Sequence, residues 1–200
     1  MKGSLIIVGF FVLGTICGVC HLLPFDIAET NISYYALCAL MVSVGLSVGN
    51  DPQTLKNFRS LNPRLVFLPI MTILGTLAGS AAVSLILTHR SITDCLAVGS
   101  GFGYYSLSSI FITEYKGAEL GTIALLANIS REILTLLAAP LLVRWFGNLA
   151  PISAGGATTM DTTLPIITRT AGQQFVVVSI FHGFVVDFSV PFLVTLFCSI

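Results

Sequence analysis

The sequence predicts an all-α integral membrane protein that crosses the bilayer several times. Apolar residues make up 55% of the 200 residues and charged residues only 9%, and the mean hydropathy is +0.95. A soluble domain carries about 25% charged residues, so this chain has too few charges to cover a surface that faces water. The formal net charge is +0, which offers no basic patch to nucleic acid. We expect about five to six spanning helices in a single transport domain, residues 1–200.

Three apolar stretches in residues 1–93 have the length of spanning helices, and we interpret them as scaffold. A hydrocarbon core of ~30 Å needs roughly 20 helical residues. The stretches cover residues 5–23, 33–49 and 65–88. The first stretch lacks a convincing small-residue cleavage site, so we interpret it as a retained helix rather than a signal peptide.

The loop that follows the second stretch is the most basic loop of the chain. It contains Lys56, Arg59 and Arg64. Cytoplasmic loops carry an excess of Lys and Arg, so this loop is predicted to lie in the cytoplasm, with the N-terminus on the same side. Arg90, on the opposite side in this assignment, weighs against it.

Residues 94–200 are predicted to carry the functional site, because polar residues gather there at membrane depth. Two glycine-rich segments, near 99–113 and 153–167, interrupt the apolar pattern; the first precedes a span over 120–146 and the second a span over 174–200. Unwound backbone is tolerated in a membrane where protein or a water-filled cavity satisfies it. Glycine accepts unusual backbone angles, and Ser and Thr can bond the freed groups. The sequence leaves open whether these broken segments re-enter or cross, and small residues also simply favour close helix packing.

The two segments match each other when the chain is shifted by 53 residues, which indicates a repeat. Each has small residues, a glycine, a hydroxyl-rich turn and an aliphatic run that ends at a base. The matched pairs are Gly103 with Gly156, Ser106 with Thr159, Leu107 with Met160, Ser108 with Asp161, Ser109 with Thr162, and Lys116 with Arg169. Transporters built from repeats bind their substrates at such paired broken helices. We therefore assign Gly103, Gly156, Ser106, Ser108, Thr159 and Thr162 to the expected binding site, as half of a crossing pair of broken helices.

Arg131 and Glu132 lie at the middle of the 120–146 span. A charge near the bilayer centre costs about 3 kcal/mol or more, so both need an explanation. Adjacent residues point about 100° apart on a helix, so the two side chains need not pair with each other. We expect Glu132 to face a cavity and Arg131 to neutralise another carboxylate such as Asp161. The alternative is an internal structural ion pair.

Four further titratable residues are candidates. Asp161 is the strongest, because it lies in a broken segment beside backbone that is already polar. Glu114 ends the first glycine-rich segment and is equally compatible with an interfacial position. His182 and Asp187 are five residues apart and do not share a helix face cleanly, and a lone membrane histidine is often a packing residue. A carboxylate that binds either a proton or a cationic substrate is the simplest element of an antiporter.

No cofactor and no metal site are expected. The chain has five cysteines, and two of them form CGVC inside an apolar stretch. We interpret them as small packing residues rather than metal or redox groups.

Four motifs resemble the C-terminal half of the lysine exporter (LysO) family: "SGFGYYSLSSIFITE", "SREILTLLAAPLL", "GGATTMDTTLPIITRT" and "FHGF". The resemblance implies export of L-lysine, and of lysine analogues, across the bacterial inner membrane. It places the acidic membrane residues of the family on Glu132 and Asp161, and Glu114 and Arg131 also match. The family pattern has no acid at Asp187. Family members are longer, so we expect either a small membrane subunit that supplies the missing N-terminal helices or a homo-oligomer.

Two other functions remain open at this stage. The chain could be a non-catalytic membrane subunit that completes a transporter. It could also be an intramembrane aspartyl protease with Asp161 and Asp187 as its dyad, although the GxGD surroundings of such enzymes are missing. The segment "GSGFG" is not a dinucleotide site, since no strand–turn–helix unit of a soluble domain surrounds it.

Overall fold

The computed structural model describes residues 13, 16–17, 63–87 and 89–200. The expected span over 33–49 lies outside these residues, and only isolated positions of the span over 5–23 fall inside them. The chain divides into two compact units, Met1–Leu46 and Ser47–Ile200, and the helices from residue 63 onward belong to the second. Within the described residues the secondary structure is helical and contains no strand, as the composition predicts.

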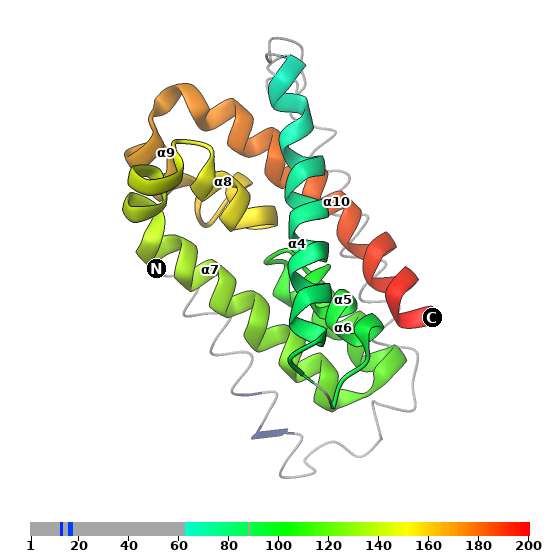
Figure 1. The fold of residues 1–200 in the computed structure, drawn as a ribbon. Helices are drawn as coiled ribbons and strands as arrows, with labels where there is room; N and C mark the ends of the chain where they lie inside the picture. The colour runs from blue at the N-terminus through cyan, green and yellow to red at the C-terminus, as the bar shows by residue number, and fades with distance from the viewer. Residues whose placement is uncertain (1–12, 14–15, 18–62, 88) are drawn as a thin grey trace. The chain divides into compact units, whose positions relative to one another are not determined.

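Three long helices form the frame of the second unit (Figure 1). Helix α4 covers Leu68–Ser84, α7 covers Ala118–Phe146 and α10 covers Val176–Ser199. With the short 3-10 turns η2 (Pro63–Phe67) and η4 (Gln173–Phe175) before α4 and α10, each is long and apolar enough to cross a membrane. They correspond to the last three predicted spans. At about 1.5 Å per residue, the 29 residues of α7 extend roughly 43 Å.

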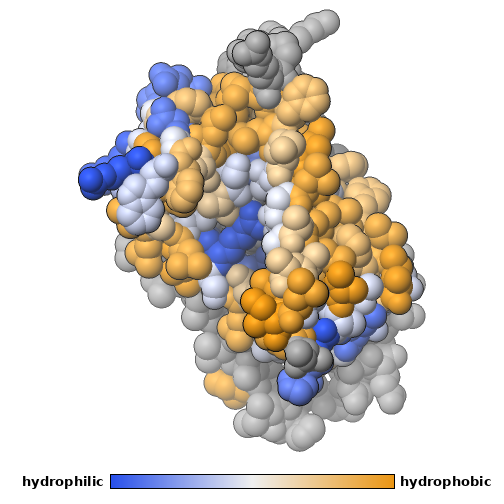
Figure 2. Space-filling view, in the orientation of Figure 1, coloured by the Kyte–Doolittle hydropathy of each residue, from blue (hydrophilic) through white to orange (hydrophobic). Residues whose placement is uncertain are grey.

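The outer faces of the three long helices are apolar, as a lipid-facing surface requires. Met71 on α4, Leu137 on α7 and Phe192 on α10 are each more than half exposed. Figure 2 shows this apolar surface over α4 and α10. Large apolar side chains that face outward are stable when lipid covers them, because lipid removes them from water.

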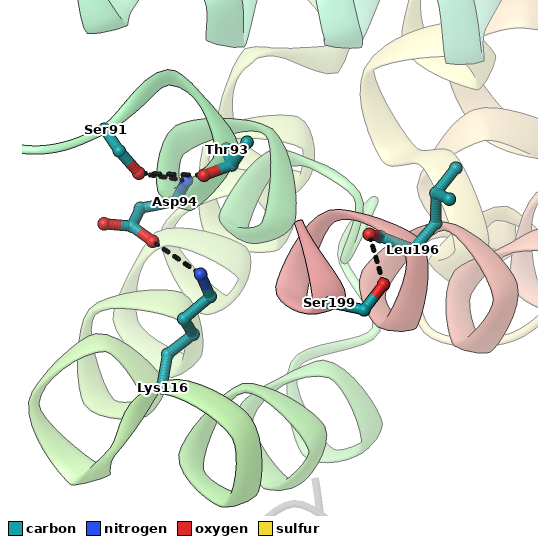
Figure 3. A network of polar contacts seen from close by, with 6 residues as sticks. All are labelled: Ser91, Thr93, Asp94, Lys116, Leu196 and Ser199. Atoms are coloured by element: carbon teal, nitrogen blue, oxygen red, sulfur yellow. Dashed lines mark hydrogen bonds and ion pairs between the residues drawn. The ribbon is translucent and has the colours of Figure 1, made fainter.

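The first glycine-rich segment folds as a re-entrant hairpin, here called hairpin 1. It consists of α5 (Ile92–Gly99), a turn over residues 100–104, and α6 (Tyr105–Lys116). The Asp94 carboxylate in the first turn of α5 lies 3.8 Å from the Nζ atom of Lys116, the last residue of α6, as Figure 3 shows. Since the start of α5 and the end of α6 lie together, the segment enters and returns on one side.

The second glycine-rich segment folds in the same way and is called hairpin 2. It consists of α8 (Ala150–Gly155), the 3-10 turn η3 (Gly156–Met160) and α9 (Leu164–Ala171). Ile152 near the start of α8 and Ala171 at the end of α9 share one buried cluster. The two ends of this segment therefore also lie together, so the expected crossing pair is a pair of re-entrant hairpins instead.

The hairpins enter from opposite ends of α7 (Figure 1). Hairpin 1 is joined to the start of α7 through Gly117, and hairpin 2 follows the end of α7 after a short turn. The start of α10 lies at the hairpin 2 end, since Val178 packs in the cluster of Ile152. Its other end lies at hairpin 1, because Cys198 is within electrostatic range of Lys116 and Asp94. The tips of both hairpins point towards the middle of the frame.

Candidate functional site

The tips of the two hairpins meet through their backbones. The Ala157 N–H donates a 2.9 Å hydrogen bond to the carbonyl oxygen of Phe102. Gly103 (φ 94°) and Gly156 (φ 62°) have backbone angles that favour glycine. A Cβ atom on Gly156 would collide with the Phe102 carbonyl oxygen, and one on Gly103 would lie 3.1 Å from the Gly155 carbonyl oxygen. The shift of 53 residues thus pairs two glycines with the same role, each at the tip of a hairpin.

Asn128 of α7 binds the broken backbone of hairpin 1. Its Oδ1 atom accepts a 2.8 Å hydrogen bond from the Gly103 N–H, and its Nδ2 atom donates to the Val98 carbonyl at 3.3 Å, near the end of α5. It also donates to the Ala124 carbonyl of α7 at 2.9 Å. The side chain is only 3% exposed. Asn128 therefore satisfies groups that the break leaves without helical partners.

Arg131 lies one turn further along α7 and binds the broken backbone of hairpin 2. Its Nε atom donates to the Ala154 carbonyl at 2.7 Å and its Nη2 atom to the Ser153 carbonyl at 3.0 Å. These carbonyls belong to the last turn of α8, where a positive charge also balances the helix dipole. A third bond reaches the Thr76 hydroxyl of α4 at 3.4 Å. The expected Arg131–Asp161 pair is therefore wrong, because the guanidinium is used to cap α8.

A polar chain links hairpin 2 to α4 and α10. The Nδ1 atom of His182 lies 3.2 Å from the Thr159 hydroxyl, and its Nε2 atom lies 2.9 Å from the Thr72 hydroxyl of α4. The imidazole is fully buried. Next to it, a Cβ atom on Gly183 would lie 2.7 Å from the Met160 backbone nitrogen. His182 thus bridges three elements at a tight contact, and α4 is more than the scaffold that the sequence predicts.

Three carboxylates from three elements lie within electrostatic range around the hairpin tips, and we call them the acidic cluster. They are Glu132 of α7, Asp161 just after η3, and Asp187 of α10. Asp161 influences the charge of both Glu132 and Asp187. Tyr104 lies in the field of Asp161 and Asp187, and Tyr105 in that of Glu132 and Asp161. Asp161 is exposed, Glu132 half-buried and Asp187 buried.

Of the predicted hydroxyl residues, Thr162 contacts the acidic cluster, whereas Ser106 and Ser108 take part in hydrogen bonds within hairpin 1. Thr162 interacts with the Glu132 carboxylate, and its backbone N–H donates to Asp161 Oδ1. Ser108 is buried and donates to the Tyr104 carbonyl at 2.8 Å, which stabilises the turn of hairpin 1. Ser106 is half-buried in the first turn of α6, and its carbonyl accepts a 3.3 Å bond from the Ser109 hydroxyl.

Glu114 is not part of the acidic cluster. It is exposed near the end of α6, nine residues after the helix begins at Tyr105, so it lies about 14 Å along the helix from the tip. The segment turns back at residues 100–104, and α6 carries Glu114 away from the tip to the surface.

A cavity of about 770 Å³ lies between α4, α5 and α7, on the face of α7 that Glu132 does not share. It has the size of a small-molecule pocket, ~300–1,000 Å³. Asn128 and Arg131 line its inner end, and Asp94 and Arg90 line it near the entrance of hairpin 1. Figure 2 shows a hydrophilic patch at the bottom of the hollow between α4 and α7. In the described part of the chain, no group of three His, Cys, Asp or Glu residues could hold a metal ion.

Comparison with known proteins identifies the family. The family model of the lysine exporter LysO matches residues 8–198. The chain belongs to the LysO family. It is 36% identical over 196 residues to the lysine exporter LysO of Escherichia coli (strain K12), a match that covers 98% of this chain and 64% of that protein. It is 35% identical over 165 residues to a protein of Haemophilus influenzae named "Putative lysine exporter", covering 82% of this chain and 83% of the relative. No solved structure matches the chain.

Within this LysO family member, most of the polar residues predicted from the sequence lie at or near the hairpin tips, but the sequence does not single out Asn128. A signal for Asn128 existed, since it lies three residues before Arg131 and so on the same helix face. The resemblance gives Asp187 no role, since the family pattern has no acid there, yet the fold brings it within electrostatic range of Asp161. The family is one of transporters rather than enzymes, and the chain is an α-helical membrane protein.

Proposed function

We propose that this protein is a secondary transporter that exports L-lysine, and lysine analogues, across the bacterial inner membrane in exchange for protons. One observation carries the proposal: in a member of the LysO family, an acidic cluster lies at the meeting point of two re-entrant hairpins. The chain spans about two thirds of the length of the E. coli relative, so its own activity is a matter for direct assay.

The polar groups of the tips match the charges of lysine. An ammonium group forms strong charge-assisted hydrogen bonds with carboxylates such as Glu132 and Asp161. The lysine α-carboxylate is suited to the free N–H groups at the start of α6 or α9. Both helices begin without a side-chain cap. Of their first residues, Tyr105 already donates its N–H to the Gly103 carbonyl and Pro165 has no N–H, so the N–H groups of the neighbouring residues are the candidates. A proton and an ammonium group that bind within one cluster of carboxylates disfavour each other, because each neutralises negative charge that the other needs, and this is the basis of an exchange of lysine for protons.

The basic residues orient the protein. At the hairpin 2 end, Arg144 and Arg169 are exposed and belong to none of the ion pairs of the described residues. At the hairpin 1 end, Arg90 pairs with Glu119 and Lys116 with Asp94. By the positive-inside rule the hairpin 2 end is cytoplasmic, in agreement with the basic loop of Lys56, Arg59 and Arg64. The cavity between α4, α5 and α7 then opens towards the outside.

Export assays with matched carboxylate variants test the proposal. Cells that express the chain should contain less lysine and should resist a toxic lysine analogue. Glu132→Gln or Asp161→Asn should reduce both effects to the level of cells without the protein, while the protein still reaches the membrane. Glu114→Gln, an exposed acid outside the cluster, is the control and should export normally. Normal export by both cluster variants would rule out the carboxylate mechanism.

Reconstitution tests whether the chain transports without a partner. The purified chain in proteoliposomes should exchange external labelled lysine for internal lysine. Such exchange by this chain alone would exclude the alternative in which it is a non-catalytic subunit. If exchange appears only after a small membrane subunit is added, the chain is part of a two-component exporter.

A further inference from the structure

Asp187 of α10 has a position that the family resemblance does not explain. It lies one helical turn after Gly183, and residues four apart share a helix face. At Gly183 the helix approaches hairpin 2 so closely that a Cβ atom would lie 2.7 Å from the Met160 backbone nitrogen and 2.9 Å from the Met160 Cβ atom. Asp187 therefore lies on the face of α10 that packs against hairpin 2, one turn from the point where the helix meets Met160.

The carboxylate of Asp187 is enclosed, and the described residues provide it with no hydrogen-bond or ion-pair partner. The residue is 7% exposed, which makes it the most buried of the three acids of the cluster. No described residue gives it a hydrogen bond or an ion pair. At the same time, the described residues contain no unsatisfied polar side-chain atom that is sealed from solvent, so its oxygens keep some access. A buried carboxylate without a partner is costly unless it binds a cation.

The groups around Asp187 are acids or neutral polar groups. Asp161 faces it from hairpin 2 and Tyr104 from hairpin 1, and His182 lies five residues earlier on its own helix. Asp94 and Lys116, of α5 and α6, lie at the far end of α10 beside Cys198. Arg131 is used by the carbonyls of α8. Among the described residues, then, nothing supplies the positive charge that Asp187 needs.

We propose that Asp187 is the proton-binding carboxylate of this transporter, while Glu132 and Asp161 bind the ammonium group of the cargo. The inference rests on the proposed function as an antiporter. A proton needs one carboxylate oxygen, whereas a metal ion needs several ligands, and the described residues offer no such group. Asp161 is exposed and Glu132 half-buried, so they are accessible to a lysine-sized molecule, and the enclosed Asp187 is accessible only to something much smaller.

The exchange then proceeds by charge alone. When a lysine ammonium group binds at Asp161, its positive charge stabilises the Asp187 anion, the O–H bond breaks and the proton leaves to the cytoplasm. When lysine leaves to the outside, a proton from the outside forms an O–H bond at an Asp187 oxygen. One proton enters for each lysine that leaves, and no electrons are transferred.

Infrared spectroscopy of the full chain in nanodiscs tests the proton site. Protonated carboxylic acids have a C=O stretching band of their own, and in the wild type this band should weaken when L-lysine is added or when the pH is raised. Asp187→Asn should lose that component. Asp94→Asn, the same substitution in the Lys116 pair at the far end of α10 (Figure 3), is the matched control and should keep it. Identical difference spectra for the wild type and Asp187→Asn overturn the proposal.

A second variant covers the case in which Asp187→Asn does not fold. Asp187→Glu retains a carboxylic acid in the same place, so the band should persist at a shifted frequency. Asp161→Asn should shift the Asp187 band without removing it, because it removes a neighbouring charge. A band that neither variant moves belongs to another residue and overturns the proposal.

Transport assays separate this inference from the proposed function. In proteoliposomes, lysine transport driven by a pH gradient should fall to the background of empty liposomes in Asp187→Asn, while exchange of lysine for lysine persists. Loss of both activities would make Asp187 a cargo ligand, and retention of both would remove it from the mechanism; either result overturns the inference. If the wild type transports no lysine, the proposed function fails, and the pH-dependent infrared band alone decides whether Asp187 binds a proton.

Discussion

At the scale of single residues, the contact between the hairpin tips requires a residue without a Cβ atom at position 156. Gly156 has φ 62° and ψ −126°, and a Cβ atom there would collide with the Phe102 carbonyl oxygen. Such backbone angles cost a residue other than glycine about 1–3 kcal/mol. The collision adds to this, because backbone atoms of the opposite hairpin would have to move and the Ala157–Phe102 hydrogen bond would lengthen.

We therefore expect Gly156→Ala to lower the thermal unfolding midpoint of the purified protein and to abolish lysine export. Gly117→Ala is the matched control: Gly117 has φ 92° but open space around it, so it costs the strain of about 1–3 kcal/mol without the collision. Gly79→Ala, in the open face of α4, should be neutral or stabilising by up to about 1 kcal/mol. Equal losses of stability and export for Gly156→Ala and Gly117→Ala would contradict the importance of the tip contact.

The sequence could identify residues whose type is unusual for a membrane and could not identify how they are used. Arg131 and Glu132 stand out because charges are rare at that depth, and they do occupy different sides of α7. The partner of Arg131 was unpredictable, since backbone carbonyls carry no sequence signature. The sequence does not single out Asn128, because an amide in a membrane helix is less unusual than a charge. Its side chain nevertheless binds two backbone groups of hairpin 1, as Arg131 binds two of hairpin 2.

At the scale of elements, the two glycine-rich segments that the sequence predicts to be broken both fold as re-entrant hairpins. Composition predicted where each break falls, because glycine and hydroxyl residues cluster there. It could not predict the direction after the break, which depends on contacts between distant residues. The Asp94–Lys116 pair brings together the two ends of hairpin 1, and the cluster of Ile152 and Ala171 brings together those of hairpin 2. Neither contact follows from the local pattern.

Labelling of single cysteines from each side of the membrane tests the hairpins. In a variant without native cysteines, a membrane-impermeant thiol reagent should label position 94 and position 116 from the same side. Positions 144 and 169 should react together from the opposite side, because they lie at the hairpin 2 end. A segment that crosses the membrane separates the members of a pair, so labelling of 94 and 116 from opposite sides would refute re-entry of hairpin 1.

At the scale of the whole molecule, α7 organises the site. Its two ends carry the two hairpins, and its middle provides Asn128 for one tip, Arg131 for the other, and Glu132 for the acidic cluster. One helix thus connects both breaks to a titratable group.

The distribution of charge predicts the orientation of the protein in the membrane, and fusions can measure it. The exposed bases Arg144 and Arg169 lie at the hairpin 2 end without acidic partners among the described residues, whereas the bases at the hairpin 1 end are paired with Asp94 and Glu119. Since Lys and Arg are retained in the cytoplasm, position 200, at the hairpin 1 end, should lie outside. Alkaline phosphatase fused after Ile200 should be active and green fluorescent protein fused there dark, with the opposite result for fusions after Asn148 in the turn that follows α7. An active phosphatase at Asn148 would invert the orientation, and the cavity beside Arg131 would then open towards the cytoplasm.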